Sequence, residues 1–250
     1  MLEVVSRVVK LVTGQPLPEG SAPPRWVRRV KTLVTGQPEM DSQELKQAAQ
    51  RGDVQAQFRL GLAYDSGDGM DQSNVMAMQW YRKAAAQGHA QAQHNLGVMY
   101  GTGQGVAKNH AEAFKWHEAA AQQEYADAQY TLGILYARGH GVARSEVLAV
   151  QWLRKAADLK HGRAQYVLGT MYQNGQGVEK NDAEAFKWYM AAAMQHVPDA
   201  QYSVGLMYQK GLGVARNDIE AVRWLREAAG QGVAQARNAL GMMGKSTGFP

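Results

Sequence analysis

The sequence has no cysteine, only seven prolines and no long apolar run. Without cysteine the 250-residue chain cannot form a disulfide or use a thiolate as a nucleophile or metal ligand. No stretch approaches the roughly 18 apolar residues that a membrane-spanning helix needs. The first 16 residues include Glu3, Arg7 and Lys10 and lack a small-residue cleavage motif, which is untypical of a secretory signal. These absences predict a cytoplasmic protein.

Charge of one sign is only slightly in excess. The chain has 27 Lys and Arg against 22 Asp and Glu, a net charge of +5 at pH 7. Residues 1–40 hold six of the basic side chains and three of the acidic ones, so the remainder is only mildly basic. Nucleic-acid-binding proteins usually show a stronger basic patch, and we therefore expect no nucleic-acid partner.

A strict internal repeat dominates the rest of the sequence. A glycine recurs every 36 residues from Gly61 to Gly241, and a tryptophan keeps the same step from Trp80 to Trp224. A period between about 20 and 50 residues indicates a solenoid, in which each unit packs on its neighbours. Apolar residues spaced three, four and seven apart predict two antiparallel helices per unit. We predict an all-α solenoid over residues 41–250, with five full repeats flanked by half-repeats.

The repeat also predicts how its helices begin, end and pack. Paired glycines such as Gly67 and Gly69 suit a left-handed cap followed by a tight turn. A column of Ser or Asn is expected to cap the second helix, and in three repeats a glutamate is expected to complete a capping box. The columns are Ser73, Asn109, Ser145, Asn181 and Asn217 for the caps, and Glu112, Glu184 and Glu220 for the boxes.

A glycine in the middle of the first helix, as at Gly61, lowers helix propensity and therefore predicts a close approach of the second helix. The tryptophan ring is the expected occupant of that space. Between repeats, a glycine is replaced in the middle units, and there we expect differently shaped turns. The replaced column runs Gly52, Gly88, Glu124, Lys160, His196 and Gly232.

Residues 1–40 precede the repeats and contain the sequence LVTGQP twice. Each copy follows a basic, valine-rich stretch, which predicts two short amphipathic helices that end at glycine and proline. This extension is expected to pack on the open end of the solenoid. The alternative is contact with a membrane surface or a partner through residues 1–34.

The segment QAQFRLGLAYDSGDG followed by MQWYRKAA, and its copy DAQYTLGILYARGHGV with VQWLRKAA, resembles the Sel-one-like repeat (SLR) family, a relative of tetratricopeptide repeats. The similarity covers about residues 42 to 243. The resemblance implies a right-handed superhelix of helix pairs whose concave surface binds other proteins.

A candidate partner surface follows from columns that vary while the repeat frame stays fixed and that point away from the internal face of the first helix. A mostly aliphatic stripe is flanked there by polar and charged groups, which suits a peptide or a protein loop. Beside it runs an aromatic column, which either fills the seams between repeats or forms a binding ladder. The candidate residues are Phe58, Arg59, Leu62, His94, Asn95, Val98, Tyr130, Thr131, Ile134, Arg138, Tyr166, Thr170, Asn174, Tyr202, Leu206 and Lys210.

Some sequence patterns resemble ligand-binding or catalytic motifs but do not meet the requirements of those motifs. Gly101, Gly103 and Gly105 resemble a phosphate-binding loop, but that loop needs a preceding strand, whereas this spacing recurs between helices. His110 and His117 lie seven residues apart without a carboxylate in register, so we expect surface or seam histidines and no zinc. Nucleophile, base and orienting residues do not gather in one place. We expect no catalysis, no cofactor and no metal.

The predicted function is that of a noncatalytic scaffold or adaptor that binds a protein or peptide on its concave surface. Two alternatives stay open. One is an immunity or inhibitor protein that neutralises a toxic effector enzyme, and the other is a peripheral membrane adaptor that acts through the N-terminal helices. The oligomeric state does not follow from the sequence.

Overall fold

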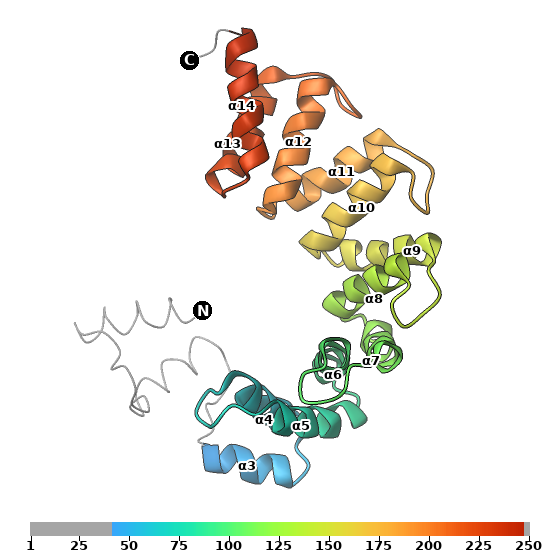
Figure 1. Cartoon of the computed structure of the whole chain (residues 1–250), viewed down its shortest axis with the longest axis vertical. Coiled ribbons are helices and arrows are strands. Elements are labelled where there is room, and N and C mark those ends of the chain that lie inside the picture. Colours follow the sequence, from blue (N-terminus) through green and yellow to red (C-terminus); the bar gives the residue numbers. More distant parts are fainter. Residues whose placement is uncertain (1–41, 248–250) are drawn as a thin grey trace, which may run out of the picture. The chain divides into compact units, whose positions relative to one another are not determined.

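The computed structural model describes the backbone of residues 42–247 and the side chains of residues 42–243 (Figure 1). This part contains twelve α-helices and no strand. They are α3 Ser42–Gln50, α4 Val54–Ser66, α5 Asn74–Ala86, α6 Ala90–Thr102, α7 His110–Gln122, α8 Ala126–Arg138, α9 Glu146–Asp158, α10 Gly162–Asn174, α11 Asp182–Ala193, α12 Pro198–Lys210, α13 Asp218–Gly230 and α14 Ala234–Thr247. Between residues 42 and 247, no helix combines the length and apolar character needed to cross a bilayer. The predicted N-terminal extension lies outside the described residues.

Two compact units divide the chain between residues 87 and 88. The first contains α3 to α5, and α4 packs on both α3 and α5. The second contains α6 to α14, in which α6 and α7, α8 and α9, α10 and α11, and α12 and α13 form helix pairs, and α14 packs on α13 (Figure 1). The predicted all-α solenoid with a 36-residue repeat of helix pairs is confirmed.

The glycine of each first helix makes room for a side chain of the second helix. A Cβ at Gly169 would lie 2.7 Å from Cδ1 of Tyr189, and one at Gly133 would lie 2.7 Å from Cγ of Leu153. The predicted close approach is therefore confirmed, but the predicted tryptophan is wrong. The occupant is the residue after it, because one residue turns a helix by 100° and aims that position at the partner helix. The occupants are Tyr81, His117, Leu153, Tyr189 and Leu225.

The tryptophans pack at the joints between repeats instead. In the first unit, Trp80 lies in a cluster with Ala48 and Ala49 of α3. In the second unit, Trp152 packs against the equivalent pair of alanines at the end of α7. Two small side chains in succession leave a flat surface on which an indole can lie. The joint between repeats thus uses a different column from the contact within a repeat.

The helix caps follow the prediction, but the capping boxes do not. The side chain of Asn109 accepts a hydrogen bond from Glu112 N at 3.1 Å, and the other four cap residues accept in the same way. The backbone N–H of Asn109, however, donates to Tyr100 O at 2.8 Å, so it does not need the carboxylate. Glu112 pairs with Lys115 at 2.7 Å, and Glu184 and Glu220 make the same pair with Lys187 and Arg223. The predicted capping boxes are therefore wrong.

The turns between repeats keep a left-handed residue at the same position although the residue itself changes. Glu124, Lys160 and His196 have φ of 60°, 62° and 60°, in the left-handed region that Gly52 and Gly232 also occupy. The same hydrogen bond to the residue three positions earlier closes each turn, as in Lys160 N to Ala157 O at 2.9 Å. The expected difference in turn shape is limited to φ, which is 60–62° at the three non-glycine residues and 86–98° at Gly52, Gly88 and Gly232. The surrounding helices impose the turn, and the three non-glycine residues adopt a backbone conformation that costs them energy.

We predict opposite effects for two Gly to Ala substitutions. Gly169→Ala places a methyl group against the ring of Tyr189, which is 2% exposed and whose hydroxyl is held 3.0 Å from both Thr170 Oγ1 and Gln173 Oε1. Because the ring cannot move aside, this overpacking should cost about 1–3 kcal/mol. Gly241→Ala, whose Cβ would meet nothing within 4 Å, should gain up to about 1 kcal/mol of helix propensity. Chemical denaturation measures both, and equal effects at the two sites would contradict the close approach.

The folded protein should be more stable with glycine than with lysine at position 160. Lys160→Gly removes the side chain from a left-handed residue and should raise the free energy of unfolding by up to about 1 kcal/mol, after the extra freedom of glycine in the unfolded chain is counted. Lys160→Ala is the control, since alanine keeps a Cβ in the same conformation and should bring no such gain. A larger gain for alanine than for glycine would show that the lysine side chain, and not the backbone, causes the strain.

Candidate functional site

The candidate surface of the second unit is carried by α6, α8, α10 and α12. The ring of His94 on α6 lies 5.4 Å from that of Tyr125, the residue before α8. The ring of Tyr130 on α8 stacks on that of His161, the residue before α10, at 4.8 Å. These contacts link α6 to the start of α8 and α8 to the start of α10. Phe58, Arg59 and Leu62 belong to α4 in the first unit.

The aliphatic stripe lies at the edge of the core. Val98 is 39% exposed, whereas Ile134 and Leu206 are half-buried. Ile134 packs against the central hydrophobic cluster of the second unit, and Leu206 packs against the cluster around α13 and α14. A partner therefore meets a shallow apolar strip whose residues also support the fold. In the first unit, Leu62 is likewise 39% exposed.

Longer polar side chains flank this strip. Arg138, Asn174 and Lys210 end α8, α10 and α12, and all three are exposed. Among the described residues, neither Arg138 nor Lys210 makes an ion pair. Two exposed positive side chains that pair with no described carboxylate thus lie at the C-terminal ends of their helices.

The threonines and Asn95 add smaller polar groups to this face. The Thr131 hydroxyl donates to Asp127 O at 2.8 Å, and the Thr170 hydroxyl donates to Tyr166 O at 3.1 Å. Because each hydroxyl hydrogen is already used within its helix, both threonines can offer a partner mainly an acceptor. Asn95 is half-buried on α6.

The aromatic column packs against neighbouring side chains. Phe58 is only 7% exposed, and its ring centre lies 5.9 Å from that of Tyr81, so it offers a partner little surface. The ring of Tyr166 lies 5.6 Å from that of Tyr189. Tyr202 packs against the cluster of α13 and α14. The contacts of Phe58 and Tyr166 lie within one repeat, so they do not test seam filling, and Tyr166 and Tyr202 stay partly exposed.

A histidine pair, with His117 buried on α7 and His94 half-buried on α6, lies between these two helices. His117 is 3% exposed and occupies the space over Gly97, with its ring centre 4.9 Å from that of His94. Burial, followed by the charge of a protonated His94, lowers the pKa of His117 to about 3. Burial also lowers the pKa of His94, against a smaller opposing effect of the Asp127 carboxylate. Within residues 42–243, no group of three or more His, Cys, Asp or Glu is placed to hold a metal ion.

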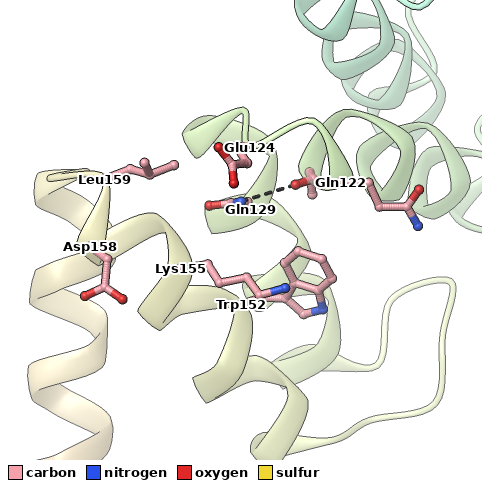
Figure 2. A pocket seen from close by; sticks show the side chains of 8 residues that line it. Gln122, Glu124, Gln129, Trp152, Lys155, Asp158 and Leu159 are labelled. Carbon is pink, nitrogen blue, oxygen red and sulfur yellow. Dashed lines mark hydrogen bonds between the residues drawn. The ribbon is translucent and has the colours of Figure 1, made fainter.

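Sequence reasoning missed a pocket on the opposite side of the first helices (Figure 2). It has a volume of about 470 Å³ and is lined by residues at the ends of α7 and α9 together with Gln129 and Trp152. One signal was present in the sequence. Leu159 stands at a position that holds Gln87, Gln123, Gln195 and Gln231 in the other four full repeats.

Comparison with known proteins gives a consistent result. The model of the Sel1 repeat matches residues 54–89, 90–125, 126–161, 162–197 and 198–233. A Sel1 repeat protein of Oxalobacter formigenes is 33% identical, with 84% of each chain covered and a TM-score of 0.74. No curated protein matches.

Two further solved structures show how far the likeness extends. A protective antigen of uropathogenic Escherichia coli with an SLR fold is 32% identical, with a TM-score of 0.80 over 97% of this chain. The present chain spans about half of that antigen, 51% of its length. An immunity protein of Pseudomonas aeruginosa is 25% identical over 81% of this chain and 70% of its own, with a TM-score of 0.49.

The buried histidine predicts acid sensitivity. Below the ordinary pKa of 6.5 the unfolded chain takes up a proton at His117, whereas the folded chain does so only near pH 3. Lowering the pH from 7 to 5 should therefore cost roughly 2 kcal/mol of folding free energy at this residue.

His117→Leu, which introduces the residue found at Leu153 and Leu225, should remove that part of the loss. Chemical denaturation at the two pH values measures it. His140→Gln, at an exposed site, controls for the loss of a histidine. An unchanged pH dependence in His117→Leu would show that His117 is not the source.

Proposed function

Because the chain belongs to the Sel1 repeat family, we propose that it is a noncatalytic scaffold that binds a protein or peptide across its first helices. The observation that carries this proposal is the line of partly exposed apolar side chains on α6, α8 and α12, which Thr170 interrupts on α10 and which Arg138 and Lys210 flank. An apolar centre with a polar rim is typical of protein interfaces, and arginine is enriched among the residues that dominate binding energy.

Rigid support makes this surface suitable for recognition. Behind each first helix, a side chain of the second helix fills the glycine gap, as Tyr189 does at Gly169. The exposed side chains are therefore held on helices that lose little conformational entropy when a partner binds. A preformed surface of this kind suits a folded partner or a short peptide.

Two other roles belong to the same proposal as alternatives. An inhibitor of a toxic enzyme would use the same helices, but would cover them with one tightly bound partner. A peripheral membrane adaptor would depend on residues 1–34, which lie outside the described residues. A cytoplasmic location stays a prediction.

The test compares two triple variants in capture experiments from the native host. Val98→Glu, Arg138→Glu and Lys210→Glu change exposed sites on the first helices. Val147→Glu, Lys180→Glu and Arg226→Glu change exposed sites outside them and alter the net charge by the same amount. We expect the first triple to lose a partner that wild type and the second triple retain, with an affinity at least about a hundredfold lower when the purified partner is titrated.

Circular dichroism confirms that both triples are folded. If both triple variants lose the partner equally, binding depends on net charge. If the first triple variant retains the partner fully, the first helices are not the interface. If the retained partner is a single toxic enzyme whose activity the chain blocks, the inhibitor alternative replaces the scaffold.

A further inference from the structure

A column of buried glutamines ties each repeat to its neighbour. Gln165 on α10 is 5% exposed, and its Nε2 donates to Ala157 O at 3.0 Å while its Oε1 accepts from Gln195 Nε2 at 2.7 Å. One bond thus reaches back to the preceding repeat, and the other reaches forward to the end of the second helix in the same repeat. Gln57 and Gln201 make the same two bonds.

Gln129 breaks this pattern. Its Nε2 donates to Ala121 O at 3.2 Å, but Leu159 stands where the second glutamine would be. Gln129 is 3% exposed, and its Oε1 has no hydrogen-bond partner in the described part of the chain. A buried acceptor that has lost its water without gaining a donor is unfavourable, and a ligand that supplies a donor removes that penalty.

The pocket described above lies at this joint. Figure 2 shows Nε2 of Gln129 engaged on one side and its oxygen on the other, toward Leu159, with Glu124 above and Lys155 below it in the view. The volume of about 470 Å³ is within the range of small-molecule sites and is larger than a single side chain requires. Because Leu159 is 47% exposed, it is a surface side chain that can turn away from Gln129.

The charges around the pocket favour a cation. The carboxylates of Glu124 and Asp158 line it, and neither makes an ion pair with another described residue. The indole of Trp152 forms another wall, and Lys155 Nζ lies 4.1 Å from its ring centre. The position of Lys155 shows that the indole face accepts a positive charge.

We propose that this pocket binds an arginine side chain of a protein or peptide partner. A guanidinium group has five N–H donors in a flat fork, so it can donate to Gln129 Oε1 and to a carboxylate at once. Its flat face suits the indole of Trp152, where it takes the place of the Lys155 ammonium, and its apolar stem suits Leu159. This site shares no residue with the surface under Proposed function and does not rest on it.

The experiment titrates the ¹⁵N-labelled full chain with N-acetyl-arginine methylamide and follows the side-chain amide of Gln129 and the indole N–H of Trp152 by NMR. We expect saturable shifts of both signals in wild type. N-acetyl-citrulline methylamide, which keeps the length of arginine and three of its five N–H donors but carries no charge, should bind at least about tenfold more weakly. Glu124→Gln combined with Asp158→Asn should weaken arginine binding by a similar factor.

Two variants distinguish the contribution of the unpaired Gln129 oxygen to arginine binding from that of the two carboxylates. Leu159→Gln supplies the internal donor found at the other joints, so it should abolish arginine binding and raise the melting temperature. Gln195→Leu creates the same unpaired oxygen on Gln165, but at a joint where Lys160 and Met194 replace Glu124 and Asp158. No arginine should bind at that second joint.

The proposal is overturned if wild type shows no saturable shift, if Leu159→Gln still binds, or if citrulline binds as well as arginine. Equal arginine binding at both joints of Gln195→Leu would also overturn it, because the carboxylates would then play no part. The triple variant Val98→Glu, Arg138→Glu and Lys210→Glu should bind the arginine probe normally, so failure of the scaffold proposal leaves this result unaffected.

Discussion

The contact between a second-helix side chain and the bare backbone of a first-helix glycine fixes the geometry of every repeat. The glycine allows a tyrosine, a histidine or a leucine to lie in the same place, with Tyr81, His117 and Leu153 as examples. The three side chains differ in how their polar atoms, where they have any, are accommodated in the interior. Tyr81 extends its hydroxyl to Asp65 at 3.2 Å, leucine has no polar atom, and His117 remains neutral because its pKa is lowered. In all three cases the nearest atom of the occupant would lie 2.6–2.7 Å from a Cβ placed on the glycine, so the second helix approaches the first equally closely.

Separate columns serve contacts within a repeat and contacts between repeats. Glycine and the residue opposite it hold a helix pair together, whereas paired alanines, tryptophan and glutamine join one repeat to the next. Because neither set includes the outward columns, residues such as Val98 and Arg138 can change without altering the frame. This division explains how a repeat protein keeps one fold while its recognition surface diverges.

Much of the fold could be predicted because its signals are local and repeated. Helix positions, cap residues such as Asn109 and the left-handed glycine caps follow from spacing and capping chemistry. The errors arose where two neighbouring positions are both apolar or where a distant group competes. Trp80 and Tyr81 are adjacent and equally suitable for the core, so their order over the glycine could not be read from periodicity. The capping box at Asn109 failed because the carbonyl of Tyr100, nine residues earlier, had already taken the cap amide. The sequence also could not predict how deeply each residue of the candidate face is buried, because the burial of Phe58 depends on its contact with Tyr81 of the second helix.

The glutamine bonds have a consequence for how such a chain can change its length in evolution. Donor and acceptor positions recur at one period of 36 residues, as the equivalent bonds of Gln165 and Gln201 show. Unequal recombination that adds or removes one whole period therefore leaves each remaining glutamine other than Gln129 opposite a donor and an acceptor. Leu159 departs from this interchangeability, because duplication of its repeat would copy the unpaired oxygen together with the pocket. A gene of this kind can therefore encode a longer chain with the same interior contacts. The same duplication can also produce a second copy of the pocket at Leu159.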